Sequence, residues 1–513
     1  MSRKFCWLTF ALVCCLGAAR AQAPRIFYTE PDKDDSRRTS FEIIGKLNNQ
    51  FFIYKANRGE DAIGIYDAEM KLKEKVALDF TPDQQMINTD FVAYPNFFYM
   101  FYQYEKRNVV HCMAVKFDAN GKKLTDPVEL DTTHIGFANN NKIYTMVNSD
   151  DKQRIMLFKI NSRRQDNFVF TTLLFDNQLM LLRKDRMGMA MEERNDFFSD
   201  FLLTNEGDLV FSKFIKSGGT DYINKAYMVI KYPEKSQFEI TDIGFGERII
   251  DDIKLKADNN NKRILFNAFY YKQRRGNIEG LYSVVWDKNT NTRFKETVLK
   301  FSDDLRASAR HSDASLRMAF DDYYIKNIIA RKDGGFLLVS ETEYVSTRGG
   351  HINRWDMMGY GWGNPWANPY SSWYWSPAFS PYGTPWNRWN SSPINRYHAE
   401  NVMILSFDKD GKMEWNNIIP KTQYDDETDN MVSFAIMNTG DAIHFLFNLL
   451  ERRNLMLNDH TLSGDGKVTR NPTLKNLDKG YEFMPRYGKQ VAARQMIVPC
   501  VYRNYLCFAR VDF

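Results

Sequence analysis

The segment "VMILSFDKDGKMEWNNI", residues 402–418, decides the fold, because it combines two apolar runs with a turn signal. Asp410-Gly411 separates the two runs. This dipeptide supplies the positive φ angle that a tight hairpin needs, so the segment predicts two antiparallel strands. "MAVKFDANGKKLTDPVEL", residues 113–130, has the same plan around Asn120-Gly121. The hairpin is therefore expected to recur along the chain.

A short apolar or aromatic run also recurs, and its copies mark the period of the repeat. Most neighbouring copies lie about 46 to 58 residues apart, which gives a unit of about 53 residues. The middle residues of the eight runs are Phe52, Phe98, Met156, Val210, Leu265, Leu337, Phe445 and Ile497. Each unit contains four predicted strands, and this size and strand number are typical of a β-propeller blade.

We therefore predict an all-β chain with a single β-propeller over residues 22–513. Eight blades are expected, and seven are the alternative if the first and last copies share one blade. "RIFYTE", residues 25–30, would then add a strand to the last blade. In repeat layout and turn chemistry the chain resembles secreted β-propeller proteins of bacterial envelopes. It lacks the diagnostic residues of WD40 and kelch repeats, so the resemblance implies no activity.

The N-terminus has the layout of a secretory signal peptide. Arg3 and Lys4 precede an apolar run that ends near Ala19, and Ala19-Arg20-Ala21 is a small-x-small cleavage pattern. We expect residues 1–21 to be removed and the protein to be exported to the periplasm or the cell surface. The formal charge of +5 then falls to about +2, which gives no argument for a nucleic-acid partner. No other run is long enough for a transmembrane helix.

Three cysteines remain after this cleavage, which is too few for a disulfide framework. A turn at Arg503-Asn504 would place Cys500 opposite Cys507. A disulfide bridge and two buried free thiols are both compatible with this pattern.

No standard catalytic or nucleotide-binding motif is present, and the seven histidines are scattered. "DKDGK", residues 408–412, resembles the start of a calcium loop. Its twelfth position is Ile419 instead of a bidentate glutamate, so we predict a plain hairpin turn there. We expect no cofactor, with a divalent cation such as Ca²⁺ as the alternative.

Small polar residues recur just before or within the strand that precedes each apolar run. If these strands are the innermost of their blades, the residues would form a ring around one mouth of the central channel. Such a ring would suit a cation or a polyhydroxylated ligand, and the alternative is that it satisfies backbone groups in a wet channel. Besides Ser40, the predicted ring contains Asp90, Asn141, Asp200, Asp252, Asn327 and Ser433.

A long aromatic-rich segment, residues 346–397, interrupts one unit. Its prolines exclude a continuous strand ladder. We consider three roles for it: a plug over the propeller, a docking loop for another envelope protein, or a set of flat rings that stack on a sugar. It contains seven of the chain's ten tryptophans, Trp355, Trp362, Trp366, Trp373, Trp375, Trp386 and Trp389.

Two further segments break the strand pattern, and both are expected to lie over one face of the propeller. Residues 303–322 are predicted to hold a short helix. Residues 179–194, "LMLLRKDRMGMAMEER", are rich in methionine and are expected to pack between blades.

Together these features predict a non-enzymatic binding or scaffold protein of the bacterial envelope, with an envelope protein or a glycan as partner. The alternative is a carbohydrate-binding or carbohydrate-active propeller, either a hydrolase or a lyase. In that case Asp90, Asp200 and Asp252 are the candidate acid and base groups.

Overall fold

The computed structural model describes most of the chain from Pro24 to Phe513. The described ranges are 24–32, 39–57, 60–81, 86–135, 143–164, 167–190, 196–216, 222–274, 276–309, 320, 322–347, 350–352, 396–426, 428–451, 454–474 and 480–513. The predicted signal peptide, Asn141 and the seven tryptophans of the aromatic segment lie outside them. No helix among the described residues is long and apolar enough to cross a membrane.

The hairpin predicted over residues 402–418 is present. β26 (Arg396–Phe407) and β27 (Met413–Ile419) pair with each other in antiparallel fashion. The Asp408 side chain accepts the backbone N–H groups of Asp410 and Lys412 at 3.0 and 2.8 Å, and Gly411 has a φ of 73°. Asp408 therefore serves the turn, as expected for a hairpin.

The described strands form seven sheets, most of them four-stranded and antiparallel. The first three sheets follow one another in sequence. They contain β2 (Ser40–Leu47), β3 (Gln50–Asn57), β4 (Glu60–Tyr66) and β5 (Leu72–Ala77); β6 (Met86–Ala93), β7 (Phe97–Lys106), β8 (Val109–Asp118) and β9 (Val128–His134); and β10 (Tyr144–Asn148), β11 (Arg154–Arg164), β12 (Asn167–Asp176) and β13 (Leu181–Ala190).

The next sheet has nine strands and contains two four-stranded series joined by the short β18. Its strands are β14 (Asp196–Leu203), β15 (Leu209–Lys216), β16 (Ile223–Lys231), β17 (Glu239–Asp242), β18 (Ile249–Ile250), β19 (Lys254–Asp258), β20 (Arg263–Tyr271), β21 (Ile278–Asp287) and β22 (Thr292–Lys300). The helix α2 (Asp303–Ala309) follows it.

Three sheets complete the chain. They contain β23 (Tyr323–Ala330), β24 (Phe336–Thr347), β25 (Gly350–Ile352), β26, β27 and β28 (Gln423–Asp425); β29 (Phe434–Asn438), β30 (Ala442–Glu451), β31 (Asn454–Ser463) and β32 (Val468–Arg470); and β33 (Tyr481–Phe483), β34 (Lys489–Ala492), β35 (Gln495–Tyr502), β36 (Tyr505–Asp512) and β1 (Arg25–Tyr28). The 3₁₀ helix η3 (Pro485–Tyr487) precedes β34.

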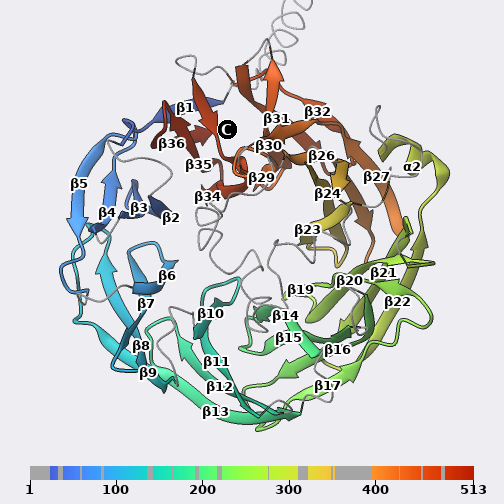
Figure 1. Ribbon diagram of the computed structural model, residues 1–513, viewed down its shortest axis with the longest axis horizontal. Helices are drawn as coiled ribbons and strands as arrows, with labels where there is room; N and C mark the ends of the chain where they lie inside the picture. Colours follow the sequence, from blue (N-terminus) through green and yellow to red (C-terminus); the bar gives the residue numbers. More distant parts are fainter. Residues whose placement is uncertain are drawn as a thin grey trace, which may run out of the picture.

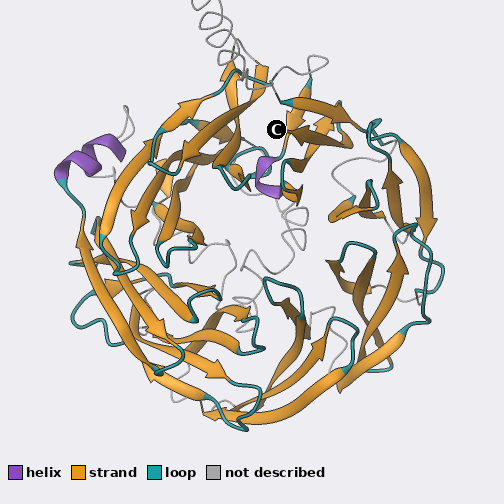
Figure 2. Cartoon of the chain, turned by 180° about the vertical axis from the view of Figure 1, so that it is seen from behind, coloured by secondary structure: helices purple, strands orange, loops and turns teal. Residues whose placement is uncertain are grey.

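The sheets are arranged as a ring, which is a propeller-like fold (Figure 1). Strands such as β6, β10 and β14 lie toward the centre, and β5, β9 and β13 lie at the outside. The view from behind shows the same ring, built almost wholly of strands (Figure 2). β1 pairs with β36, with Arg25 opposite Asp512, so the two ends of the described chain meet in one sheet.

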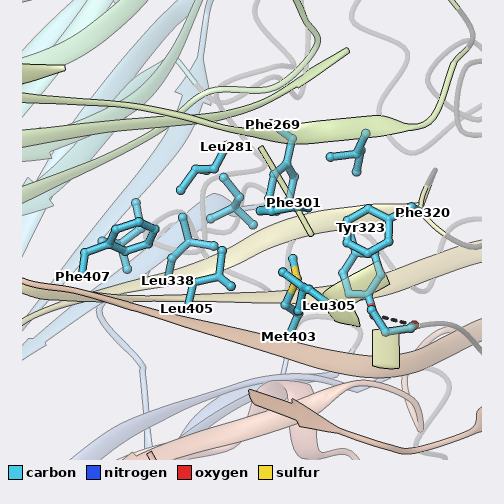
Figure 3. Close-up of a cluster of buried hydrophobic side chains, with 14 of the residues drawn as sticks. Phe269, Leu281, Phe301, Leu305, Phe320, Tyr323, Leu338, Met403, Leu405 and Phe407 are labelled. Carbon is cyan, nitrogen blue, oxygen red and sulfur yellow. Dashed lines mark hydrogen bonds between the residues drawn. The ribbon is translucent and has the colours of Figure 1, made fainter. Parts of the chain in front are cut away.

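Buried side chains lie between neighbouring sheets instead of in one central core. Leu281 of β21, Leu338 of β24 and Leu405 of β26 belong to one cluster, which Leu305 of α2 also joins (Figure 3). Such sheet-to-sheet clusters recur around the ring. Each sheet therefore depends on its neighbours for burial, as in other repeat folds.

One expectation about the irregular segments needs correction. The methionine-rich segment does not lie over a face, because residues 181–190 form β13, the outermost strand of its sheet. Met187 and Met189 are buried whereas Gly188 is exposed, so the strand alternates with period two. The predicted packing of this segment between blades is confirmed, because Met187 and Met189 share a cluster with Phe198 and Phe211 of the next sheet. The short helix predicted within residues 303–322 is also confirmed, as α2.

The antiparallel order of each sheet places two kinds of connection on one face of the ring. One is the segment that leads into each inner strand. The other is the link between the second and third strands of a sheet. We call this side of the ring the entry face. The aromatic segment, which separates β25 from β26, starts and ends on it.

Candidate functional site

A group of buried and half-buried polar side chains, most of them charged, lies where β24, the start of β29 and η3 meet near the entry face. We call it the carboxylate cluster. It consists of Lys326, Glu341, Glu343, Lys421, Asp429, Ser433 and Arg486.

Glu341 forms the buried centre of this cluster. It projects from β24, and its side chain and that of Lys421 are both 0% exposed. Oε1 of Glu341 lies 2.7 Å from Nζ of Lys421, and the Ser433 hydroxyl donates to Oε2 at 2.5 Å. Gln423 holds this arrangement in place, because its Oε1 accepts bonds from the Lys421 ammonium and the Ser433 backbone N–H.

Glu343 lies two residues farther along β24 and binds two cations. Lys326 Nζ lies 2.5 Å from Oε2, and Arg486 Nη2 lies 2.9 Å from Oε1. The other side of the Arg486 guanidinium binds Asp429. The Lys326 and Arg486 side chains are 28% and 17% exposed, whereas Glu343 is 3% exposed. The Lys326 and Arg486 side chains are therefore partly exposed, and the carboxylate that pairs with both is buried.

The two glutamates have opposite pKa shifts. Burial and the neighbouring Glu343 raise the pKa of Glu341, against the effect of Lys421. Burial also acts to raise the pKa of Glu343, but Lys326 and Arg486 outweigh it and lower that pKa. Burial lowers the pKa of Lys421. The two carboxyl groups, two residues apart on β24, therefore differ in how strongly their surroundings favour the charged form.

The base of the aromatic segment adjoins this cluster along β24 and β26. The Tyr344 ring stacks on His398 with centroids 4.3 Å apart, and its hydroxyl donates to Glu400. Arg396 forms two bonds with Asp426 and lies over the ring of Tyr424. Tyr424 is 49% exposed. The stem of the aromatic segment therefore exposes an aromatic ring at Tyr424, on the opposite face of the sheet from Glu343.

The structure brings two residues of the predicted ring together through a lysine. Asp200 and Asp252 lie 3.5 and 3.9 Å from Nζ of Lys254. Asp200 also accepts the backbone N–H of Leu255, and its φ of 54° is unusual for a residue other than glycine. Burial raises the pKa of Asp200, with Asp252 adding to the shift and Lys254 opposing it.

The other described ring residues have separate environments. Asp90 is largely buried in β6 and accepts a bond from Asn88. Asn327 is exposed on β23, next to Lys326 of the carboxylate cluster. Ser433 belongs to the cluster itself. The described members are thus divided between two charged groups and single positions, and Asn141 lies outside the described residues.

The sequence interpretation missed Glu341, Glu343, Lys421 and Arg486. One signal was present: "SETEY" places two glutamates at alternate positions inside a strand whose preceding run is apolar. Charged residues are rarely fully buried without partners, so this spacing indicates a paired internal site. Lys421 and Arg486 lie in connections between strands, and no local sequence pattern predicts that these connections contact β24.

The described residues contain no metal-binding group, and one small polar cavity lies away from the carboxylate cluster. No group of three or more histidine, cysteine, aspartate or glutamate side chains there is placed to hold a metal ion. A polar cavity of 130 Å³ lies on the face opposite the entry face, between the turns at Asn205 and Asn259. Ligand pockets are usually roughly 300 to 1,000 Å³, so this cavity is small for an organic ligand.

Comparisons with known proteins give only distant likenesses. No protein-family model and no curated protein matches the sequence. The structure is similar to the polysaccharide lyase Uly1, with 10% identity, 82% of this chain and 89% of that chain covered, and a TM-score of 0.38. It is also similar to prolyl oligopeptidase B from Galerina marginata, with 8% identity, 91% of this chain and 56% of that chain covered, and a TM-score of 0.41. A third likeness is to a GH43 endo-arabinanase from Bacillus licheniformis, with 11% identity, 51% of this chain and 98% of that chain covered, and a TM-score of 0.25. These likenesses assign no activity to the chain.

Proposed function

We propose that this protein is an exported binding protein that recognises an acidic glycan on the entry face of a β-propeller. The observation that carries the proposal is the pair of partly exposed cations, Lys326 and Arg486, held by the buried Glu343 carboxylate. Charged groups fixed by a buried partner need little reordering when a ligand binds, which favours recognition. The carboxylate of an acidic sugar is a matching acceptor for both donors.

The aromatic residues of the stem and of the segment beyond it favour a sugar over a simple anion. Tyr424 exposes an aromatic ring near the stem, and the segment that continues from the stem contains seven tryptophans. Binding sites commonly combine aromatic surface with a few fixed polar groups. We propose that the aromatic segment supplies ring faces for the glycan while Lys326 and Arg486 select its charge.

The proposal includes an eight-bladed ring. Division of the nine-stranded sheet at β18 supports this count, because it yields the series β14–β17 and β19–β22. The pairing of β1 with β36 supports closure by the N-terminal strand. Export remains a proposal that rests on the signal-peptide pattern of residues 1–21.

Isothermal titration with polygalacturonate and with its methyl ester tests the proposed function, since the two polymers differ in charge at the same backbone. We expect binding of the acid form and weak or no binding of the ester. Lys326→Gln removes one charge-assisted bond and is expected to weaken binding about ten- to a hundredfold, since such bonds contribute about 1.5 to 3 kcal/mol.

Lys262→Gln is the matched control, because Lys262 is a half-exposed lysine near the cavity on the opposite face. Equal binding of acid and ester, or equal effects of the two substitutions, would refute charge selection by Lys326. If neither polymer binds, the glycan proposal fails, and docking to another envelope protein becomes the function to test.

A second candidate is a carbohydrate-active enzyme that uses Asp200 and Asp252. The observation favouring it is the strained backbone of Asp200 together with the raised pKa that its burial causes. Incubation with the same polymers would release shortened or unsaturated products, and Asp200→Asn would abolish them. If the polymer stays intact after prolonged incubation with a high concentration of the protein, this candidate is contradicted.

A further inference from the structure

Two thiols face each other inside the sheet that contains both ends of the described chain. Cys500 lies on β35 and Cys507 on β36, and the strand register places them directly opposite each other. Their Sγ atoms are 2.9 Å apart. Both side chains are 0% exposed, at the contact between this sheet and the β29–β32 sheet.

We propose that Cys500 and Cys507 form a cross-strand disulfide when the chain folds in an oxidising compartment. Opposite residues of a hydrogen-bonded antiparallel pair have Cα atoms about 5.5 Å apart. Disulfides join Cα atoms about 4.4 to 6.8 Å apart, so the backbone need not move for the bond to form. The proposal is independent of the glycan-binding function and uses export only for the oxidising compartment in the cell.

The reaction is a thiol–disulfide exchange with an external disulfide, either oxidised glutathione or a thiol–disulfide oxidoreductase. One cysteine thiolate attacks the oxidant and releases one of its sulfurs as a thiol. The second cysteine then attacks the resulting mixed disulfide and releases the other. The pair loses two electrons and two protons, and the oxidant's disulfide gains them as two thiols.

The burial of the pair determines when this exchange takes place. Tyr28 of β1 and Tyr481 of β33 pack against the cluster that contains both cysteines. Burial also raises the pKa of Cys500, which suppresses its thiolate in the folded protein. The disulfide is therefore expected to form during folding, before β1 docks on β36.

Peptide mapping of refolded protein tests the proposal directly, because trypsin cuts after Arg503 in the turn between the two cysteines. Denatured, reduced protein is refolded with a mixture of reduced and oxidised glutathione, and the folded monomer is collected. It is then denatured, alkylated with iodoacetamide and digested. A bridge joins the peptides 495–503 and 504–510 into one species that separates after reduction.

Two further samples serve as controls. The Cys507→Ser protein must lose the joined species and show alkylated Cys500, and the Cys112 peptide must be alkylated throughout as a free-thiol standard. If refolding yields no monomer, protein secreted to the periplasm of a bacterial host replaces it in the same digest. Separately alkylated Cys500 and Cys507 in folded protein, or a bond from either one to Cys112, would overturn the proposal.

Discussion

At the scale of single residues, the account depends on a fully buried ion pair and the groups around it. Glu341 and Lys421 are both inaccessible to solvent, and each has further partners in Ser433 and Gln423. Removing two charges from water costs several kcal/mol per ion, so such a pair persists only with good geometry. Loss of one partner leaves the other charge buried and unpaired.

Lys421→Met is therefore expected to destabilise the protein by about 3 to 5 kcal/mol. Lys256→Met is the matched control, because Lys256 pairs with Asp150 at the surface and such pairs contribute about 0 to 1 kcal/mol. Urea unfolding of both variants measures the difference. Equal midpoints for the two variants would contradict the importance of the buried pair.

The opposite pKa shifts of the two glutamates predict distinct pH effects. Glu343 has a lowered folded pKa, so its contribution is present above its unfolded pKa of about 4.3 and is lost as the pH falls through the folded value. Glu341 has a raised folded pKa, so its contribution is present below about pH 4.3 and is lost as the pH rises through the folded value.

Glu343→Gln should make stability less sensitive to acid between about pH 5 and pH 3, although the variant is less stable at neutral pH. The free energy of unfolding measured across this range checks the slope. If the unfolding free energy of the variant depends on pH as steeply as that of the unmodified protein, Lys326 and Arg486 do not stabilise the charged form of Glu343.

The sequence predicted part of this site and missed its centre. Ser433 was assigned to an inner-strand position, and it does lie before β29, where it bonds to Glu341. Glu341 directly follows an apolar run in β24, and this run was interpreted only as a core strand. Lys421 and Ser433 lie about 80 to 90 positions after Glu341, and Arg486 lies 143 positions after Glu343. Such pairings depend on the packing of neighbouring sheets, which local patterns do not encode.

At the scale of elements, one turn recurs between the third and fourth strands of several sheets. In these turns an aspartate accepts two backbone N–H groups, and the residue three positions later has a positive φ. The aspartates are Asp67, Asp118, Asp176 and Asp408. The positive-φ residues are Met70, Gly121, Leu179 and Gly411. The turn thus depends on the aspartate as well as on glycine.

Gly466 tests the demand for glycine at a related turn. Its φ is 85°, and a Cβ atom there would lie 2.6 Å from the ring of Trp415. Gly466→Ala is expected to cost about 1 to 3 kcal/mol from backbone strain alone, and more from the ring contact. Gly464→Ala in the same turn is the control, because a Cβ there meets nothing within 4 Å. Denaturant midpoints that shift equally would contradict this turn geometry.

The sequence predicted these elements well where glycine marked the turn. The hairpins at Gly121 and Gly411 were identified from Asn-Gly and Asp-Gly. The equivalent turns at Met70 and Leu179 have no such signal, because a non-glycine residue adopts the left-handed conformation there. Methionine content also misdirected the interpretation of β13, whose alternating burial of Met187 and Met189 is a strand period.

At the scale of the whole molecule, the N-terminal strand completes the sheet that holds the C-terminus. β1 covers the outer edge of β36, and Ile26 and Tyr28 pack against the cluster beneath. An uncovered strand edge is a template for pairing with another chain. The pairing of β1 with β36 therefore closes the ring and also prevents β36 from pairing with another chain.

A chain that begins at Glu30 should unfold at a lower temperature and self-associate through the uncovered edge of β36. A chain that begins at Pro24 retains β1 and is the control. Calorimetry and light scattering at several protein concentrations compare the two. A monomeric truncated protein with an unchanged melting temperature would contradict closure by β1.

The most direct test of the central claim is a crystal structure of the protein with an oligogalacturonate bound. The account predicts a sugar carboxylate within hydrogen-bonding distance of Lys326 Nζ and the Arg486 guanidinium on the entry face, with Glu343 still beneath both. An oligosaccharide bound at Asp200 and Asp252, or on the opposite face, would contradict the assignment of the binding site to the carboxylate cluster.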